Sequence, residues 1–179
     1  MPHAPEFFET DRLVAERLAF RHLEEFARFL QSPADTAWLG GARPTVEVLR
    51  GIEGGMRHWL VYGFGRWIFR DRGTGQFAGL GGLRKVVLFG SPALDLGYAL
   101  SAGHQGRGLG TEMVRVIVDV GFGAVGADQI TAVTLPHNRA SRRVLEKLGF
   151  RCEGEIRHAG LPHVLYRLRA RDWRARHAR

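Results

Sequence analysis

The segment HQGRGLGTE, residues 104–112, places three glycines at alternate positions in front of an apolar-periodic run. The apolar residues that follow recur at intervals of three and four, which predicts an amphipathic helix from about Leu109. Residues 94–100 alternate in the manner of a strand, after a break at Gly90-Ser-Pro92. The glycines therefore connect a strand to a helix, and we expect something to come close to their backbone.

The spacing of these glycines distinguishes between three phosphate-binding loops. A Walker loop needs a lysine where this chain has Leu109, and a dinucleotide-binding fingerprint needs its last glycine one residue beyond Gly110. The pattern Gln/Arg-x-x-Gly-x-Gly/Ala fits without adjustment from Gln105 to Gly110. Successive backbone N–H groups and the start of a helix form a positive pole suited to a pyrophosphate. A glycine-rich turn with purely structural duties is the alternative.

Length and composition limit the remaining possibilities. With 179 residues, of which 45% are apolar, we expect one domain. The first residues lack a basic start with an apolar run, and no window approaches the roughly 18 apolar residues of a membrane span. We therefore expect a cytoplasmic protein without a membrane segment. Cys152 is the only cysteine, and we expect it to be a small buried apolar residue rather than a nucleophile.

The formal net charge of +8 comes almost wholly from arginine, since Lys85 and Lys147 are the only lysines. A basic surface can attract nucleic acid or a ribosome. However, the chain has no basic stripe interleaved with aromatic residues of the kind that binds RNA. A basic surface that contacts only solvent is the alternative to association with nucleic acid or a ribosome.

Periodicity and turn residues predict a mixed order of strands and helices. Strands are expected at 17–21, 67–70, 76–87, 94–100, 129–135, 151–156 and 164–168. Helices are expected at 22–30, from Thr45, from about Leu109 and at 138–148. The second half then contains a β-helix-β-helix unit, and the fold class is α/β (α+β).

Several further motifs follow one another in an order that is similar to one acetyltransferase family. They are Glu16-Arg-Leu-Ala-Phe-Arg21, Gly65-Arg-Trp67, Gly79-Leu-Gly-Gly-Leu83, Leu96-Gly-Tyr98, Gly108-Leu-Gly-Thr-Glu112, Asn138-Arg-Ala-Ser141, Leu148-Gly-Phe150, Leu165-Tyr-Arg-Leu168 and Asp172-Trp173. Together with the glycine loop, they resemble the GCN5-related N-acetyltransferase (GNAT) superfamily, in particular its RimJ/RimL branch of ribosomal-protein N-terminal acetyltransferases. The segment before Glu16 is extra for that branch, and the loop near 157–163 is short.

This resemblance implies a single GNAT-like domain over residues 1–179, with an N-terminal extension at 1–15 and a basic tail at 170–179. It implies a central mixed, mostly antiparallel sheet with a splayed strand pair and helices on both faces. The implied cosubstrate is acetyl-CoA. No His-x-x-x-His pair lies on an expected helix, so a metal is not expected.

The resemblance also assigns site residues. Coenzyme contacts are expected from Tyr98, Ala99, Leu100, Gln105, Gly106, Arg107, Gly108, Leu109, Gly110, Thr111, Asn138 and Ser141. Asp95 is the candidate general base, although its place in the strand fits a solvent-facing carboxylate equally well. Ser141 is the candidate partner of the leaving thiolate, and Asn138 is also a good helix N-cap. Glu112 is expected to complement the helix dipole.

The function implied is transfer of an acetyl group from acetyl-CoA to a primary amine by direct attack on the thioester. The acceptor stays open between a protein N-terminus and a small amine or antibiotic. The basic surface argues against cationic acceptors, unless an acidic patch of Asp95, Glu47 and Glu53 outweighs it. A non-catalytic acyl-CoA-binding or RNA-associated module is the alternative from another class. A homodimer also stays open.

Overall fold

The computed structural model describes residues 3–158 and 160–177. The strands of these residues are β1 (Phe7–Glu9), β2 (Leu13–Arg17), β3 (Arg66–Asp71), β4 (Phe77–Leu88), β5 (Ser91–Leu100), β6 (Gln129–Thr134), β7 (Arg151–His158) and β8 (Leu161–Arg169). The α-helices are α1 (Leu23–Gln31), α2 (Pro33–Thr36), α3 (Thr45–Tyr62), α4 (Leu109–Phe122), α5 (Arg139–Lys147) and α6 (Ala170–His177). Two 3-10 turns, η1 (Phe20–His22) and η2 (Ala102–His104), complete the order.

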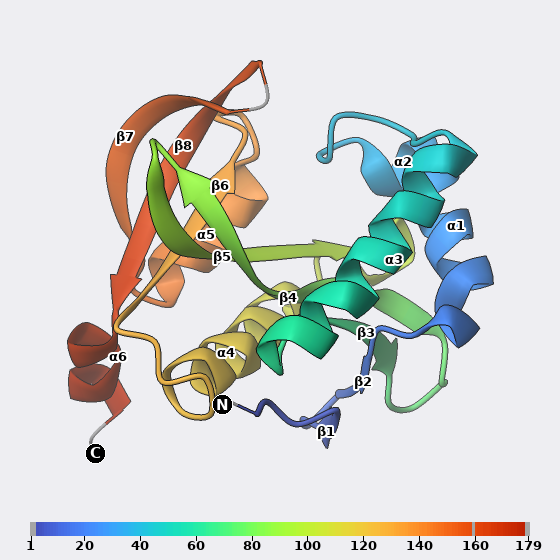
Figure 1. Ribbon diagram of the computed structural model, residues 1–179, viewed down its shortest axis with the longest axis horizontal. Helices are drawn as coiled ribbons and strands as arrows, with labels where there is room; N and C mark the ends of the chain where they lie inside the picture. Colours follow the sequence, from blue (N-terminus) through green and yellow to red (C-terminus); the bar gives the residue numbers. More distant parts are fainter. Residues whose placement is uncertain (1–2, 159, 178–179) are drawn as a thin grey trace.

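The strands form one sheet in the order β1-β2-β3-β4-β5-β6-β8-β7. Within the described chain, β5 and β6 are the one parallel pair, and every other neighbouring pair is antiparallel. Figure 1 shows β6, β7 and β8 turning away from the rest of the sheet beyond β5. The expected mixed, mostly antiparallel sheet is confirmed.

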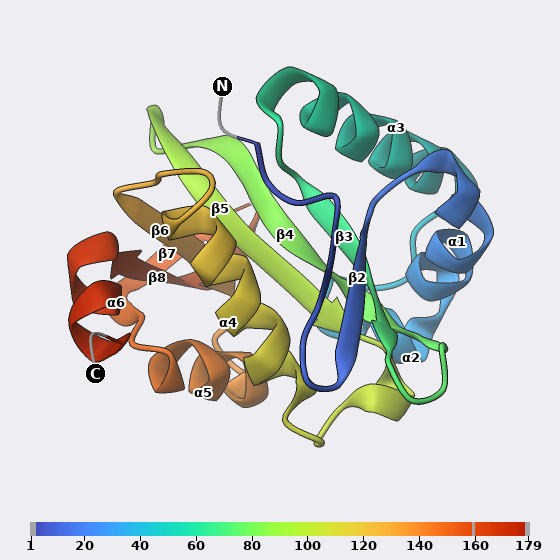
Figure 2. The same cartoon turned by 90° about the horizontal axis from the view of Figure 1, so that it is seen from below.

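Helices cover both faces of the sheet, as expected. Figure 2 shows α1, α2 and α3 on one side and α4 with α5 on the other. On the first side, Phe26 and Ile52 pack in a cluster with Ile68 of β3. On the other side, Met113 and Ile117 of α4 belong to the larger core cluster. The apolar stripe after the glycine loop therefore packs α4 against the sheet, as its period predicts.

The strand expected at 17–21 is wrong. Strand β2 ends at Arg17 because its partner β3 begins at Arg66, and the last contact is the Leu18 N–H donating to the Arg66 carbonyl at 3.0 Å. The ring of His22 then accepts a hydrogen bond from the Ala19 N–H at 3.1 Å and turns the chain into η1. The alternation of polar and apolar residues here reflects one buried anchor before a turn, not a longer strand.

The expected burial of Cys152 is also wrong, because this residue is exposed. It lies on β7, which pairs only with β8 and forms the edge of the sheet. At the other end of the chain, Trp173 of α6 is buried and its indole N–H donates to Asp119 at 2.9 Å. The division into an extension at 1–15 and a tail at 170–179 stays a prediction.

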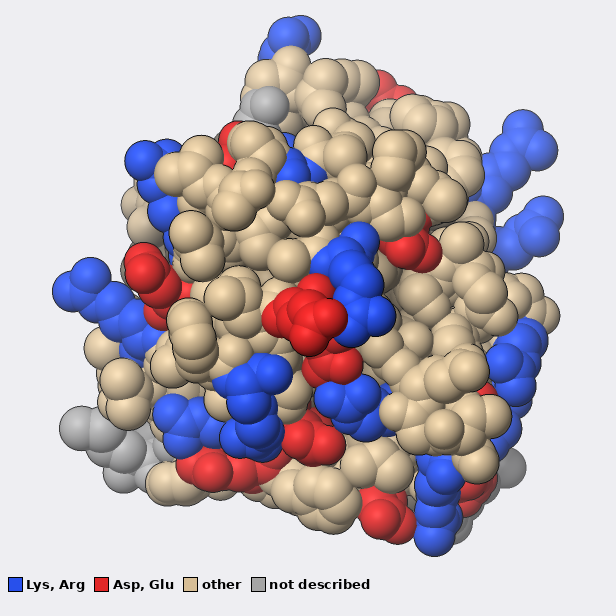
Figure 3. All heavy atoms as spheres, turned by 90° about the vertical axis from the view of Figure 1, so that its right-hand side faces the viewer, with Lys and Arg blue, Asp and Glu red and all other residues tan. Residues whose placement is uncertain are grey.

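The charges on the surface are mixed. On the face shown in Figure 3, acidic side chains lie among the basic ones, so the net charge of +8 does not form one continuous basic field there. In the part of the chain that the structure describes, no helix combines the length and apolar character needed to cross a membrane.

Candidate active site

The sheet opens between β5 and β6. The pair Asp95 and Thr131 is the one register contact between these strands in the described chain, while β5 continues to Leu100. The Thr131 hydroxyl donates to the Leu94 carbonyl at 3.1 Å and closes the narrow end of the opening. The edge of β5 from Leu96 to Leu100 therefore has no strand partner on the β6 side. The splayed strand pair expected from the resemblance is present, and Tyr98, Ala99 and Leu100 lie on its free edge.

The glycine loop lies at the end of β5, where it leads from η2 into α4. Gly106 and Gly108 have φ values of 73° and 78°, in the left-handed region that favours glycine, and Gly108 caps α4. Among the described residues, none of the five backbone N–H groups from Gly106 to Gly110 has a hydrogen-bond acceptor. A Cβ added at Gly106 would meet nothing within 4 Å. Five free amides at a helix N-terminus form the positive pole that an anion needs.

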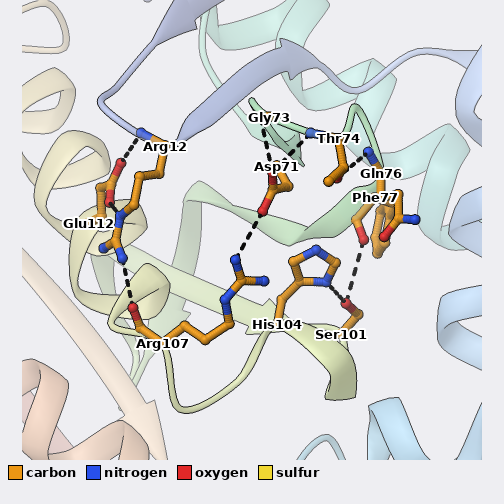
Figure 4. Close-up of polar contacts among 10 residues, drawn as sticks. All are labelled: Arg12, Asp71, Gly73, Thr74, Gln76, Phe77, Ser101, His104, Arg107 and Glu112. Atoms are coloured by element: carbon orange, nitrogen blue, oxygen red, sulfur yellow. Dashed lines mark hydrogen bonds and ion pairs between the residues drawn. The ribbon is translucent and has the colours of Figure 1, made fainter.

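Two ion pairs attach this loop to distant turns. Glu112, in the first turn of α4, accepts hydrogen bonds from the Thr10 hydroxyl at 2.6 Å and from the Arg12 N–H at 2.8 Å. The Arg12 guanidinium binds the same carboxylate at 2.7 Å and also donates to the Arg107 carbonyl at 2.8 Å. Burial raises the pKa of Glu112, but these hydrogen bonds outweigh burial and lower it. Figure 4 shows this bridge between the β1–β2 turn and the glycine loop.

The side chain of Arg107 points away from the loop. Its guanidinium lies 3.5 Å from Asp71, a carboxylate that also accepts from the Gly73 and Thr74 N–H groups in the β3–β4 turn (Figure 4). In this arrangement, Arg107 can therefore make the expected coenzyme contact with its backbone N–H rather than with its side chain. From the sequence, Glu112 was expected only to complement the helix dipole. Arg12 could not be found in this way, because a pair 100 residues apart in sequence leaves no local pattern.

Ser141 and Tyr98 meet on the α4–α5 side of the opening. Asn138 caps α5, and its Oδ1 accepts from the Ser141 N–H at 3.0 Å. The Tyr98 hydroxyl donates to Ser141 Oγ at 3.3 Å. Burial raises the pKa of Tyr98, although the bond to Ser141 lowers it in part. Only the backbone of Tyr98 was expected to contact the coenzyme, but alternation along β5 puts its ring on the same face as Leu96.

Asp95 lies at the closed end of the opening, on the opposite face from Tyr98. Its side chain is not solvent-facing, because the residue is 5% exposed. Oδ2 lies 3.5 Å from the Arg84 guanidinium, whereas Oδ1 is buried with no hydrogen-bond partner in the described chain. Burial raises the pKa of Asp95, against the lowering effect of Arg84. Glu47 and Glu53, the possible partners of Asp95 in an acidic patch, are not among the neighbours that act on its pKa, which are Arg84, His158 and Arg66.

Two tryptophans behave differently near this face. Trp67 is fully buried, and its indole N–H donates to the Pro5 carbonyl at 2.9 Å, so it belongs to the core. Trp38, in the segment between α2 and α3, is 44% exposed, and its ring lies 5.5 Å from that of His137 beside α5. This contact joins the two halves of the molecule on either side of the split sheet. In the described residues, no group of three or more His, Cys, Asp or Glu could hold a metal ion.

Comparisons with known proteins agree with this geometry. The family model described as "Acetyltransferase (GNAT) domain" matches residues 12–151. The protein YkkB of Bacillus subtilis is 27% identical over 161 residues, which are 87% of this chain and 94% of YkkB.

Solved structures share the fold at low identity. Ribosomal-protein-S5-alanine acetyltransferase from Vibrio fischeri superposes with a TM-score of 0.73 at 22% identity, over 93% of this chain and 98% of that one. The aminoglycoside acetyltransferase AAC(6')-Ib, solved in complex with coenzyme A, gives a TM-score of 0.75 at 19% identity, over 93% and 99% of the two chains.

Proposed function

The chain belongs to the GNAT family of acetyl-CoA-dependent N-acetyltransferases, and we propose that it transfers the acetyl group through the opening between β5 and β6 to a primary amine. The observation that carries this proposal is the placement of two groups on either side of the opening. Asp95 lies on the α1–α3 face, and the Tyr98–Ser141 pair lies on the α4–α5 face. An amine can then approach from one face while the thiolate leaves on the other.

The free amides of residues 106–110 would hold the pyrophosphate of the coenzyme. Their number, and the open space at Gly106, fit a ligand with several anionic oxygens. The unpaired edge of β5 at Tyr98, Ala99 and Leu100 would bind the pantetheine arm and the thioester oxygen through backbone groups. The coenzyme supplies the activated acetyl group when it is bound. The protein supplies position and N–H groups for the charge that develops on oxygen.

Asp95 would accept the proton of the acceptor amine. An amine with a pKa of about 8 to 10 is mostly protonated at neutral pH and must lose a proton before or during attack. Oδ1 of Asp95 is buried and has no hydrogen-bond partner in the described chain, so once the carboxylate turns toward the opening it can accept a hydrogen bond from the ammonium without giving up another contact. Its raised pKa makes it a stronger base than an exposed aspartate.

The hydroxyls of Tyr98 and Ser141 would stabilise the leaving thiolate. A coenzyme thiol resembles free cysteine, with a pKa of about 8.5. Because burial holds the pKa of Tyr98 above its usual value near 10, the proton stays mainly on the phenol. We therefore assign Tyr98 the role of a hydrogen-bond donor to the thiolate, with Ser141 as its partner.

Two acceptor classes have support. The RimJ/RimL-like motifs and the fold shared with the Vibrio fischeri enzyme, whose name gives S5 alanine as its substrate, favour a protein N-terminus. The fold shared with AAC(6')-Ib, named as an aminoglycoside acetyltransferase, favours a small amine. A shared fold does not determine which of the two acceptor classes is used, because the acceptor depends on the residues that line the opening between β5 and β6.

A thiol-release assay with acetyl-CoA and a panel of peptides and small amines tests the proposal. We expect turnover on at least one primary amine, and a fall of about 10²-fold or more in kcat for Asp95→Asn. Asp128→Asn is the matched control, because Asp128 is exposed and away from the opening. If acetyl-CoA raises the thermal midpoint but no amine releases thiol, the chain is a binding module and not an enzyme.

A further inference from the structure

Two arginines lie on the same face of the sheet as Asp95. Arg84 of β4 is directly opposite Asp95 of β5. Arg66 of β3 is opposite Gly82, which in turn is opposite Gly97 of β5. Since residues paired across strands share a face, and so do residues two apart along one strand, Arg66, Arg84 and Asp95 all project toward the α1–α3 side.

The charges of this group are not balanced. Among the described residues, the one polar contact of the Asp95 side chain is the 3.5 Å pair with Arg84, which is at the long limit for a hydrogen bond. The guanidinium of Arg66 makes neither a hydrogen bond nor an ion pair with any residue in the described ranges. Burial and the positive charge of Arg84 lower the pKa of Arg66 to about 10, against the opposing effect of Asp95. Two cations therefore face one carboxylate.

Other nearby groups do not supply the missing negative charge. His58 is held with one ring nitrogen 2.7 Å from the Phe64 carbonyl and the other accepting from the Lys85 N–H at 3.0 Å. Arg167, across the opening on β8, is already paired with Glu153 at 2.6 Å. The remaining neighbour that acts on Asp95 is His158, and an imidazole supplies no carboxylate-like negative charge.

Open space between these charges lies over Gly97. The row between Arg66 and the opening consists of Gly82 and Gly97, which carry no side chains, and the backbone of Gly65 fills the position of a Cβ at Gly82. A Cβ added at Gly97 would meet nothing within 4 Å. Gly97 is adjacent to Leu96, where the free edge of β5 begins. A molecule over Gly97 would touch the opening at one end and the arginines at the other.

We propose that the acceptor is a small primary amine that also carries an anionic group a few bonds from its nitrogen, with Arg66 and Arg84 binding the anion and Asp95 Oδ1 binding the amine. This inference rests on the acetyltransferase function proposed above and names the substrate class of the same site. A free amino acid has this chemistry. A purely structural Arg84–Asp95 pair would leave Oδ1 of Asp95 buried without a hydrogen-bond partner among the described residues, at a cost that native proteins usually avoid.

Cationic acceptors fit this arrangement poorly. Polyamines and aminoglycosides bring two or more positive charges, and a second cation beside Arg66 and Arg84 would be repelled at low dielectric. A carboxylate, in contrast, can accept two parallel hydrogen bonds from a guanidinium. The arginines thus select for an anion and against a second amine.

Matched acceptor pairs test the inference. A set of α-amino acids is compared with the corresponding α-carboxamides, in which only the negative charge is removed. Peptides that begin with aspartate are tested as well. They also carry an amine with a carboxylate a few bonds away, but as part of a protein N-terminus rather than of a free amino acid. Binding to the enzyme–coenzyme A complex is measured by calorimetry, and kcat/KM by thiol release. We expect at least one amino acid to exceed its carboxamide by about 10- to 100-fold in both measurements.

Variants locate the discrimination. Arg66→Met and Arg84→Met should each remove most of the preference for the acid while leaving the KM for acetyl-CoA within about twofold. Arg57→Met is the control, since Arg57 is exposed on α3. Thermal midpoints show whether the more buried Arg66→Met folds, and Arg84→Met tests the same point at a residue whose side chain is 43% exposed.

Several outcomes would overturn the inference. They are equal use of acid and carboxamide, unchanged discrimination in folded Arg84→Met, and a preference confined to the peptides. Absence of thiol release from every amine would count against the proposed function instead. In that case, calorimetric binding of the acid but not of its carboxamide would still support an anion-binding acceptor site.

Discussion

Replacing Tyr98 with phenylalanine should slow acetyl transfer without weakening coenzyme binding. The change removes one oxygen, the hydroxyl that donates to Ser141 Oγ at 3.3 Å, and leaves the ring against the first turn of α4, where a Cβ at Gly110 would lie 3.4 Å from it. The phenol holds its proton more strongly than a thiol does, because burial raises the pKa of Tyr98. Full proton transfer to the thiolate is therefore uphill, and the hydroxyl acts as a hydrogen-bond donor.

The role of Tyr98 as a hydrogen-bond donor determines how far kcat should fall. A hydrogen bond to a charged group is worth about 1.5 to 3 kcal/mol. At about 1.4 kcal/mol for each tenfold change, kcat should fall about 10- to 100-fold, below the upper range of general acid catalysis. If Ser141 passes the hydrogen bond from Tyr98 to sulfur, Ser141→Ala should cost as much as Tyr98→Phe, and the double variant should cost little more.

The assay is thiol release at saturating acetyl-CoA, with coenzyme affinity measured separately by calorimetry. Tyr62→Phe is the control, because the Tyr62 hydroxyl makes no hydrogen bond in the described part of the chain. A kcat for Tyr98→Phe within about twofold of the parent would refute the assignment. Losses that add in the double variant would refute the relay through Ser141 but keep both residues near the sulfur.

Two other predictions concern the glycine loop. Gly108→Glu should abolish coenzyme binding in calorimetry. The control is Gly126→Glu, since Gly126 has a similar φ of 70° and a Cβ added there would meet nothing within 4 Å, so this variant should show the same backbone strain with normal binding. Equal loss of binding in both variants would argue that strain alone is responsible. Glu112→Gln should lower the free energy of unfolding by about 1 kcal/mol at pH 7. Because the folded-state pKa of Glu112 is lowered, the stabilisation by its carboxylate is present above the unfolded-state pKa and is lost as pH falls through the folded-state pKa. Urea titrations should therefore show the free energies of unfolding of the parent and Glu112→Gln converging in acid. A difference that does not change with pH would contradict stabilisation by the ionised carboxylate.

The glycine loop was predictable because its signals are local. The glycines and the apolar stripe from Leu109 act within a few residues of the start of α4, which begins at Leu109, and Asn138 acts in the same local way at the start of α5. The Glu112–Arg12 bridge, in contrast, depends on the β1–β2 turn, which lies about 100 residues away in sequence and is placed beside α4 only by the fold. No spacing within the segment 104–112 can reveal such a partner.

The environment of Asp95 could be predicted only in part. Alternation along β5 correctly separates Asp95 from Leu94 and Leu96, but it does not say whether the polar face is covered. In the structure, Asp95 is buried, and its pairing with β4 brings Arg84 opposite Asp95 and Arg66 nearby. Strand pairing is a non-local property, so the sequence did not exclude an acidic patch of Asp95, Glu47 and Glu53.

The register of β5 is what separates the two chemical roles in the proposed mechanism. Asp95 and Tyr98 are three residues apart, so the pleat puts them on opposite faces, and a shift of one residue would exchange those faces. Such a shift would bring Leu96 out of the core, where it is 2% exposed, and place Asp95 against α4 instead. It would also break the bond from the Thr131 hydroxyl to the Leu94 carbonyl, which fixes the closed end of the opening. The apolar residues of β5 therefore do more than fill the core: by fixing the register, they determine which face receives the amine and which face releases the thiol.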